Sequence, residues 1–342
     1  MDMGKYVANI ASDVIPIDKN IVVIKSLKGQ SRIKGAGMYI AIQDMIKCFR
    51  EPVCFDNAIV ELSKKYGAGS LQRLFELLID KDVLISEHKS EALNRYSDVL
   101  LEKVLFYTSG GKDVQEIIDD LKTKRIGIVG QSQLVFPLLD DLVKSRLLFN
   151  FNIGTTDDSN LANISGVNIN EYPMYSGTDL SHLQAFVENS DFLIAASNFY
   201  DHCLYTKINE LCINRGKNWL RVAIDGGNAE IGPLFISKKT CCYVCLCMRG
   251  RLNMSKEDQA LDNFYASKIE DEKESVKKIK TILFYPLYSL VSIMACAEVM
   301  KFLTGVKCNL INQVLKVDSF DFETKFDYIY KDYICPSCGQ RR

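Results

Sequence analysis

The stretches TCCYVCLC at Thr240–Cys247 and ICPSCG at Ile334–Gly339 each hold a pair of cysteines separated by two residues. Two thiolates on such a tight turn can share one Zn²⁺, and two turns complete a closed tetrahedral site of four thiolates. We therefore predict a structural zinc site that ties the end of the chain to its middle. Because a closed site has no open coordination position, we expect this metal to stabilise the fold and not to catalyse a reaction. The predicted ligands are Cys242, Cys245, Cys335 and Cys338.

Two alternatives stay open at these cysteines. A single CxxC pair can be a redox dithiol, although a second pair with a proline and a glycine favours zinc. The register of the first pair has a second solution, because Cys241 could replace Cys242 at a three-residue spacing. With the two-residue spacing, Cys241 and Cys247 are spare thiols. The remaining cysteines lie in apolar stretches and are expected to be small core residues: Cys48, Cys54, Cys203, Cys212, Cys296 and Cys308.

Length and composition predict a globular protein of about two domains. The chain has 342 residues, of which 47% are hydrophobic and 25% charged, and its net charge is −1. The charge gives no support for nucleic-acid binding, and no apolar run reaches the ~18 residues of a membrane span. No secretory signal follows Met1. We therefore expect a cytoplasmic protein without disulfides.

The first 86 residues predict a small winged-helix domain. Short extended runs come first, three helical patterns follow, and a short strand ends the domain. The predicted strands are Lys5–Ile10, Val14–Asp18, Asn20–Ser26, Gln30–Lys34 and Val83–Ile85, and the predicted helices are Gly37–Phe49, Phe55–Tyr66 and Gly69–Ile79.

Residues 87–342 predict a Rossmann-like α/β domain, because strands and helices alternate along this part of the chain. Its last part is expected to be a long apolar helix and two late strands. Ser255–Ser275, rich in charged residues, is predicted to be a solvated loop. The predicted strands are Arg125–Val129, Leu148–Ile153, Asp191–Ala196, Trp219–Asp225, Gln313–Phe320 and Phe326–Tyr330. The predicted helices are Arg95–Tyr107, Val114–Leu121, Leu134–Lys144, His202–Arg215 and Ile282–Leu303.

The turn after Arg125–Val129 is where a nucleotide-binding loop would lie. Such loops need glycines, so that backbone N–H groups can approach phosphates at a helix N-terminus. Gly130 is present, but it is followed by the side chains of Gln131, Ser132 and Gln133. The chain also has only three histidines, and no catalytic triad can be built from their spacing. We predict no catalytic residue.

An ordered set of motifs carries a family resemblance. The set runs from Asn94-Arg95-Tyr96-Ser97 through the Rossmann-type turn, Asn160-Leu161 and Gly232-Pro233-Leu234 to the two cysteine pairs. In this order the motifs resemble the ThiF/MoeB superfamily of ubiquitin-activating-like adenylating enzymes, over about Asn94 to Arg342. The N-terminal unit resembles the PqqD-related clamp that recognises leader peptides of ribosomally made natural products. The fusion of the two is similar to MccB-type enzymes and to the leader-binding subunit of azoline-forming cyclodehydratases.

The resemblance also implies that the ATP site has degenerated. Adenylating members use a glycine-rich turn, ribose-binding acidic residues, two arginines and a Mg²⁺-binding aspartate. The matching positions here are Gln131-Ser132, Asn152 and Gly154, Asp98 and Ala162-Asn163, and Asn198. Nucleotidyl chemistry requires cations and dipoles placed against phosphate charge, so we expect no ATP binding. Asp157 and Asp158 are expected to be loop or helix-cap residues rather than ribose ligands.

The resemblance implies a non-catalytic partner of a YcaO-type enzyme in the formation of thiazoline or oxazoline rings in a precursor peptide. The alternative is an active, ATP-dependent peptide-adenylating enzyme of the MccB type. A more distant possibility is a zinc-stabilised interaction protein with no link to natural products. The superfamily likeness also favours a homodimer.

In the clamp family, the leader peptide lies between an edge strand of the wing and the third helix, and this implies a peptide groove here. Exposed main-chain groups of an edge strand can take up an extended peptide. At helical spacing, the two leucines of this set are as well explained as core residues. The positions are Arg32, Ile33, Lys34, Ser70, Arg73, Leu74 and Leu77.

Overall fold

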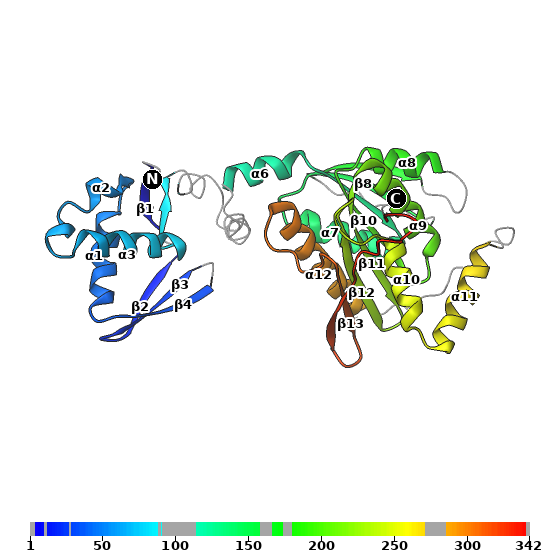
Figure 1. The fold of residues 1–342 in the computed structure, drawn as a ribbon. Coiled ribbons are helices and arrows are strands. Elements are labelled where there is room, and N and C mark those ends of the chain that lie inside the picture. The colour runs from blue at the N-terminus through cyan, green and yellow to red at the C-terminus, as the bar shows by residue number, and fades with distance from the viewer. Residues whose placement is uncertain are drawn as a thin grey trace. The chain divides into compact units, whose positions relative to one another are not determined.

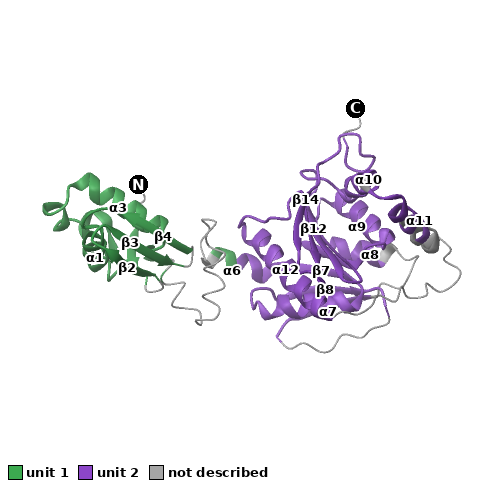
Figure 2. Cartoon of the chain, turned by 90° about the horizontal axis from the view of Figure 1, so that it is seen from below, with its two compact units in different colours: residues 1–118 green, residues 119–342 purple. Residues whose placement is uncertain are grey.

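The computed structural model describes residues 4–9, 12–26, 29–87, 90, 114–157, 166–173, 180–270 and 285–339. The chain divides into two compact units, residues 1–118 and 119–342 (Figure 2). The boundary expected from the sequence, between residues 86 and 87, falls earlier. It stays a prediction, because most residues between the two positions are outside the described part.

The N-terminal unit contains two three-stranded antiparallel sheets and a set of short helices (Figure 1). One sheet has the order β5-β1-β6 and the other is the meander β2-β3-β4. The strands are β1 (Lys5–Ala8), β2 (Asp13–Asp18), β3 (Ile21–Ser26), β4 (Gly29–Lys34), β5 (Val53–Cys54) and β6 (Leu84–Ser86). The helices are α1 (Met38–Cys48), α2 (Phe55–Ala58), a 3₁₀ turn (Leu62–Lys64) and α3 (Ala68–Asp80).

Helix α3 supplies much of the core of this unit. Its buried side chains Leu71, Leu74, Phe75 and Leu78 recur at helical spacing, which makes one face of the helix apolar. The Phe75 ring lies 5.5 Å from that of Phe49, centroid to centroid. The predicted elements agree closely with this arrangement, except that the helix expected over Phe55–Tyr66 is α2 followed by the 3₁₀ turn. The winged-helix class itself stays a prediction.

The C-terminal unit is built on one eight-stranded sheet of order β14-β13-β12-β11-β10-β7-β8-β9. The five strands from β11 to β9 are parallel, and β12, β13 and β14 add an antiparallel wing. This is a Rossmann-like order, with its switch point between β7 and β10. The strands are β7 (Arg125–Gly130), β8 (Asn150–Thr155), β9 (Asn168–Pro173), β10 (Phe192–Asn198), β11 (Asn218–Asp225), β12 (Asn228–Phe235), β13 (Gln313–Asp318) and β14 (Thr324–Tyr328).

Two groups of helices pack on this sheet (Figure 1). Helices α7 and α12 pack against each other, while α9 packs against α8, α10 and the strands β10 and β11. Among the described residues, α12 alone is long and apolar enough to cross a membrane, and 56% of its apolar 18-residue window is buried within the protein, as in a core helix. The helices of this unit are α7 (Ser132–Lys144), α8 (Leu180–Glu188), α9 (His202–Arg215), α10 (Tyr243–Asn253), α11 (Lys256–Glu270) and α12 (Tyr285–Thr304), and the boundary between the two units falls within α6 (Val114–Thr123).

One sequence-based prediction is wrong in this unit. Within the stretch expected to be a solvated loop, Ser255–Ser275, the structure has the helix α11. The Ser255 hydroxyl accepts a hydrogen bond from the Asp258 backbone N–H (3.0 Å) and so caps the helix start. Acidic residues in the first turn, Glu257 and Asp258, also favour a helix because they face its positive end. The composition of the stretch is polar, but its order of residues is that of a capped surface helix.

Gly130 ends β7 at a point where the backbone of β10 passes very close. Its φ is +143°, and a Cβ placed there would lie 1.7 Å from the Ala196 carbonyl oxygen. The neighbouring Gln131 N–H donates to that same oxygen at 3.0 Å. Only glycine permits this approach, which sets the path of the chain from β7 into α7.

We predict that Gly130→Ala lowers the free energy of unfolding by more than about 3 kcal/mol, because the added methyl group meets backbone and not a movable side chain. Urea unfolding followed by fluorescence measures this, since the single tryptophan, Trp219, is buried in the same unit.

Gly216→Ala is the matched control. Gly216 also has a positive φ, +67°, but a Cβ there meets nothing within 4 Å. This variant should therefore lose only ~1–2 kcal/mol of the free energy of unfolding, which is the cost of a non-glycine residue in the left-handed conformation. Equal losses for the two variants would contradict the close approach of β7 and β10.

Candidate functional site

The structure brings four cysteines together between α10 and the C-terminal segment. The sulfurs of Cys242, Cys245, Cys335 and Cys338 all lie within 4.8 Å of one another. Cys242 Sγ is 3.8 Å from Cys245 Sγ and 3.6 Å from Cys335 Sγ, and Cys245 Sγ is 3.4 Å from Cys338 Sγ. A tetrahedral zinc site with Zn–S bonds of about 2.3 Å has sulfurs about 3.8 Å apart. The cluster therefore has the donor set and the size to hold a metal ion such as zinc.

The surroundings of Cys245 favour its thiolate, whereas burial raises the pKa of Cys338. Cys242 is the N-cap residue of α10, so the sulfurs lie near the positive end of that helix. A hydrogen bond from the Cys242 thiol lowers the pKa of Cys245 to about 4, and the Asp332 N–H also donates to Cys245 Sγ. At Gly339 a Cβ would lie 2.5 Å from the Cys335 carbonyl oxygen. A glycine is therefore required directly after the second cysteine pair.

The two neighbouring thiols lie outside the cluster. Cys241 is buried, and burial raises its pKa to about 12, so it is a neutral thiol. Its backbone N–H donates to the Asn312 side chain at 3.2 Å. Cys247 lies further along α10 and packs against the apolar core. The structure thus groups the sulfurs in the two-residue register that we predict.

The carboxyl ends of β7, β8 and β10 form a second candidate site, since ligands of Rossmann-like sheets bind at the switch point. Asp157, which follows β8, places its carboxylate at the start of α7. Its Oδ2 accepts hydrogen bonds from the Ser132 backbone N–H (3.0 Å) and hydroxyl (2.9 Å). Asp157 is therefore a helix cap, as the sequence analysis expects. The Asp157 carboxylate therefore lies at the N-terminus of α7, where a bound anion would otherwise be stabilised.

Asn198, at the end of β10, is buried and makes structural hydrogen bonds. Its amide donates to Asp225 Oδ1 (3.1 Å), and its carbonyl oxygen accepts from the Tyr200 N–H (3.0 Å). Asp201 then caps α9 by accepting from the Leu204 N–H (3.2 Å), and burial raises the pKa of Asp201. The polar groups at this edge are thus engaged in holding loops and helix starts.

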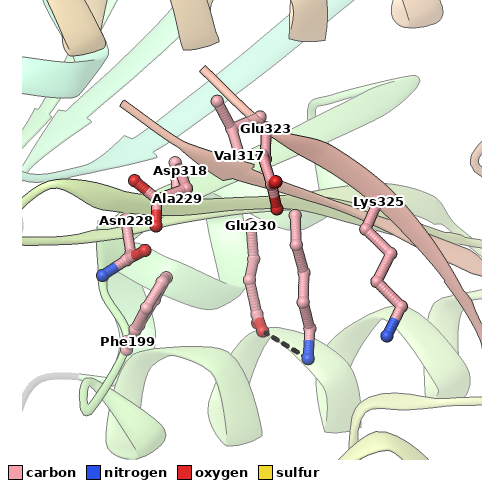
Figure 3. Close-up of a pocket in the computed structure, with 9 residues that line it drawn as sticks. Phe199, Asn228, Ala229, Glu230, Val317, Asp318, Glu323 and Lys325 are labelled. Carbon is pink, nitrogen blue, oxygen red and sulfur yellow. Dashed lines mark ion pairs between the residues drawn. The ribbon is translucent and has the colours of Figure 1, made fainter. Parts of the chain in front are cut away.

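A row of alternating charges crosses the antiparallel wing. The Arg221 guanidinium donates to Glu230 at 2.7 Å, and Lys316 lies between Glu230 (3.9 Å) and Asp327 (2.8 Å). Arg221 is only 4% exposed; burial works against its charge, but Glu230 raises the pKa of Arg221 above its usual range. Glu230 and Lys316 of this row also line a pocket of about 280 Å³. Figure 3 shows Phe199 at one side of this pocket.

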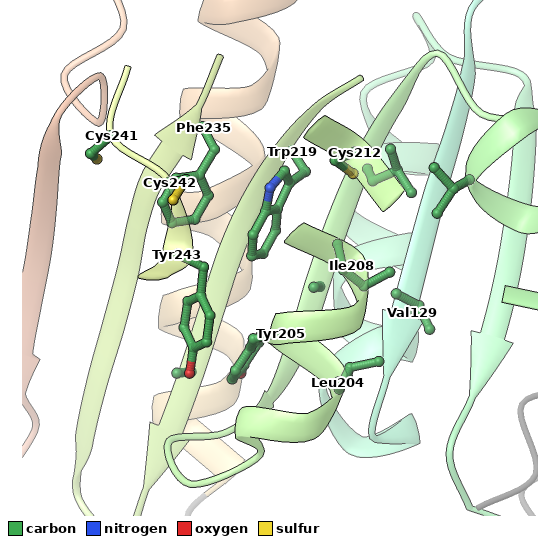
Figure 4. Close-up of a cluster of buried hydrophobic side chains, with 14 of the residues drawn as sticks. Val129, Leu204, Tyr205, Ile208, Cys212, Trp219, Phe235, Cys241, Cys242 and Tyr243 are labelled. Atoms are coloured by element: carbon green, nitrogen blue, oxygen red, sulfur yellow. The ribbon is translucent and has the colours of Figure 1, made fainter. Parts of the chain in front are cut away.

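An aromatic cluster joins the cysteine cluster to this row (Figure 4). Tyr243, directly after Cys242, accepts or donates a hydrogen bond of 2.7 Å with His202 Nδ1, and its N–H donates to Asn209. The Tyr243 ring lies 5.4 Å from that of Tyr205, which in turn lies 5.0 Å from the Arg221 guanidinium. Buried contacts therefore run without a break from the sulfurs to the charged wing.

Comparison with known families shows to which family this chain belongs. The model of the ThiF family matches residues 161–337, which is more than half of the chain. The chain belongs to the ThiF family. None of the curated proteins matches it in sequence.

Solved structures share the fold at low sequence identity. E. coli MccB has a TM-score of 0.77 and 15% identity, with 99% of this chain and 98% of MccB covered. The structure of E. coli MccB with ATP has a TM-score of 0.73 and 15% identity, over 98% of this chain and 100% of that one. The heterocyclase TruD has a TM-score of 0.62 and 15% identity, but only 43% of TruD is covered. The likeness to MccB thus extends over both units of this ThiF-family chain.

The predicted peptide-groove residues lie on β4 and α3. Strand β4 is an edge strand of its sheet among the described residues, and it alternates exposed Arg32 and Lys34 with half-buried Ile33. On α3, Ser70 and Arg73 are exposed, Leu77 is half-buried and Leu74 is 8% exposed. Leu74 therefore belongs to the core of the unit, and Leu77 lies at its border. Their role in binding a peptide stays a prediction.

Several motifs that carry the resemblance lie outside the described residues: Asn94-Arg95-Tyr96-Ser97, Asp98, Asp158, Asn160-Leu161 and Ala162-Asn163.

The sequence alone does not predict the charged row or the pocket that Glu230 and Lys316 line. Arg221 gave a signal, because it is the one charged residue between the apolar positions of a buried strand. Glu230 and Lys316 gave none, because their strand pairing depends on the order of distant strands. What sequence lacks here is the cross-strand register that sets Glu230 beside Lys316.

We predict about one zinc ion per chain, bound by the four clustered cysteines. Cys338→Ser should lose the metal and lower the free energy of unfolding by more than about 4 kcal/mol, a size that is typical of losing a structural metal. Metal analysis by mass spectrometry and urea unfolding measure the two effects. Cys203→Ser, outside the cluster, should keep both; metal-free protein with unchanged stability would contradict the site.

Proposed function

We propose that this protein binds the leader of a precursor peptide and presents it to a YcaO-type enzyme, which forms thiazoline or oxazoline rings. In this role it is the non-catalytic subunit of a cyclodehydratase. The observation that carries the proposal is the Asp157 carboxylate on the first backbone N–H of α7. It favours a scaffold over an adenylating enzyme.

The electrostatic argument concerns the place of the nucleotide. Phosphates bind at the N-terminus of the first Rossmann helix, because its free N–H groups and dipole attract negative charge. Here Asp157 uses the Ser132 N–H, so an entering phosphate would have to displace a carboxylate or lie beside it. At about 4 Å, two like charges repel by about 4 kcal/mol at an effective dielectric constant of 20. Asn198, at the position of the family's Mg²⁺-binding aspartate, adds no charge that would offset this.

The fold comparison with TruD bears on the proposed YcaO-type component. TruD is described as a heterocyclase, and this chain corresponds to only 43% of its length. If the two share a role, the part of TruD without a counterpart in these residues performs a function that these residues do not. The YcaO-type enzyme that the family resemblance implies would supply it, together with ATP and activation of the peptide backbone.

A second candidate is favoured by one observation. The chain matches E. coli MccB over the full length of both proteins, and one such structure contains ATP. This favours an active peptide-adenylating enzyme of the MccB type. The two candidates make opposite predictions about nucleotides and the same prediction about a leader peptide.

The free edge of β4 is the proposed peptide-binding element. An extended peptide can pair with the main chain of an edge strand, while its side chains reach alternate positions. Arg32 and Lys34 on β4 and Arg73 on α3 are exposed cations, which favours acidic residues in the leader. Ile33 and Leu77 are half-buried and offer apolar contacts beside these charges.

We predict no ATP–pyrophosphate exchange above background with any peptide substrate, because the Asp157 carboxylate already accepts the hydrogen bond of the Ser132 N–H, to which a phosphate would bind. Isotope exchange measures the activity, and calorimetry with ATP·Mg²⁺ measures binding. Asp157→Ala removes the internal carboxylate and is the matched control for occlusion. Exchange by the unaltered protein would make the MccB-type alternative correct.

We predict that Arg73→Glu weakens leader binding at least about tenfold, because it replaces an attractive charge with a repulsive one. The measurement is calorimetry with a synthetic leader from the precursor gene next to that of this protein. Arg50→Glu makes the same charge change at another exposed site of the unit and should leave binding intact.

The variant Leu74→Ala tests whether Leu74 lines the peptide groove or belongs to the core of the unit. Because Leu74 is buried, this change should cost ~2–4 kcal/mol of stability. Leu77→Ala should cost less stability and weaken binding more. Normal binding by a folded Arg73→Glu variant would remove α3 from the peptide site.

A further inference from the structure

Three segments of the C-terminal unit meet beside the cysteine cluster. They are residues 236–240, which lead into the first cysteine pair, the helix α10, and residues 330–334, which lead into the second pair. The Lys331 ammonium donates to the Lys238 carbonyl at 3.0 Å, and the Asp332 N–H donates to Cys245 Sγ at 3.4 Å. The exposed side chains of these segments therefore share one part of the surface.

Cations gather where the three segments meet. Lys238, Lys239 and Arg249 are exposed, and Lys331 is half-buried. A tight turn sets the two neighbouring lysines at its tip, because the Lys239 N–H donates to the Ile236 carbonyl at 3.0 Å. Within the described ranges, none of the four cationic side chains pairs with a carboxylate. This surface therefore carries positive charge that the unit does not neutralise.

Aromatic and aliphatic side chains lie among these cations. Tyr330 is 68% and Tyr333 79% exposed, so the two rings show on the order of 300 Å² to solvent, at about 200 Å² for a fully exposed ring. The Arg249 guanidinium lies 5.6 Å from the centroid of the Tyr330 ring, in a cation–π contact. Leu252, one turn after Arg249 on α10, is 86% exposed, and Ile334 is 82% exposed. Exposed apolar area of this size beside charge is typical of an interaction site.

Hydrogen bonds hold this surface in shape. The Asp332 carboxylate accepts from the Ile334 N–H at 3.0 Å, and the Asp332 carbonyl accepts from the Cys335 N–H at 3.2 Å. These bonds close a turn directly before the second cysteine pair. The Asp332 carboxylate is engaged within this turn and leaves the nearby cations without an acidic partner. A preformed surface loses little conformational entropy when a partner binds.

We propose that this cationic surface binds an acidic linear segment of a partner protein, one that carries aromatic or aliphatic side chains between its carboxylates. Cations without a partner repel one another, and the carboxylates of such a segment would relieve that repulsion. An arginine can bind a carboxylate through two parallel hydrogen bonds. Tyrosine and arginine also contribute most to binding energy at protein interfaces. The surface consists of Lys238, Lys239, Arg249, Tyr330, Lys331 and Tyr333.

The chemistry of the surface favours a peptide over a nucleic acid. Exposed rings beside cations can also stack the bases of a single strand. Two of the exposed side chains here, Leu252 and Ile334, are aliphatic; they pack against apolar side chains but offer no ring on which a base can stack. The net charge of the whole chain, −1, also lacks the basic excess that is typical of nucleic-acid-binding proteins.

A charge reversal tests the proposal. The probe is a fluorescein-labelled peptide of Glu-Glu-Phe repeats, and fluorescence anisotropy with the full chain measures its Kd. Lys239→Glu/Arg249→Glu should raise that Kd at least about tenfold, because it sets carboxylates against carboxylates. The matched control is Lys64→Glu/Arg146→Glu, which makes the same charge change at exposed positions outside this surface. It should stay within about twofold of the unaltered protein.

A second arm tests the aromatic part of the surface. Tyr330→Ala removes the ring and should raise the Kd of the Glu-Glu-Phe probe about fivefold. Tyr330→Phe keeps the ring and should stay within about twofold. A probe of Glu-Glu-Ser repeats, which has the same charge but no rings, should bind more weakly than the Glu-Glu-Phe probe. Thermal unfolding reports whether each variant is folded.

Three results would overturn the proposal. The first is that the unaltered protein does not bind the Glu-Glu-Phe probe saturably. The second is that single-stranded oligothymidine binds this surface more tightly than the acidic probe. The third is that Arg32→Glu/Arg73→Glu abolishes binding of the probe while Lys239→Glu/Arg249→Glu does not. That last result would place acidic peptides at β4 and α3, so it would support the proposed function and remove this second surface.

Discussion

The four-sulfur cluster is the constraint on which the C-terminal unit depends. Four cysteine sulfurs within 4.8 Å of one another, three of them buried, are a favourable arrangement only if a cation balances their charge or protons neutralise them. The cluster fixes α10 against the last residues of the chain. Between the two cysteine pairs lie α12 and the wing strands β13 and β14, and Ile329 enters the same core as Trp219. The antiparallel wing is thus held from both of its ends.

Internal pairing of charge is the second theme of the unit. Asp157 meets the start of α7, Asp201 meets the start of α9, and Arg221 is matched by Glu230. Each pairing places a charged side chain against a helix N-terminus or an opposite charge within the protein. Removing one partner of a buried pair is costly, because the other is left without compensation. Each charge of this set therefore has a partner within the protein, which is what the proposed scaffold role requires.

Much of this was predictable from local patterns. The βαβ order, the helix His202–Arg215 and the grouping of the cysteines depend on periodicity or on short spacings, which sequence carries directly. The helix α11 is not predicted, because its polar composition is typical of a loop although Ser255 caps the start of the helix. The row from Arg221 to Asp327 depends on strand order, β11 beside β12 beside β13 beside β14, and a single sequence carries no long-range register.

Loss of zinc and binding of nucleotide differ in how well they distinguish the proposed scaffold from an adenylating enzyme. The sulfur cluster reaches the carboxyl edge of the sheet through Tyr243, His202 and the start of α9. Loss of metal would therefore disturb a scaffold and an adenylating enzyme alike, and cannot separate them. A nucleotide-binding measurement does separate them, because Ser132 offers one backbone N–H that either Asp157 or a phosphate can use. In this chain the aspartate uses it, and a nucleotide would have to compete with a group already tethered beside it.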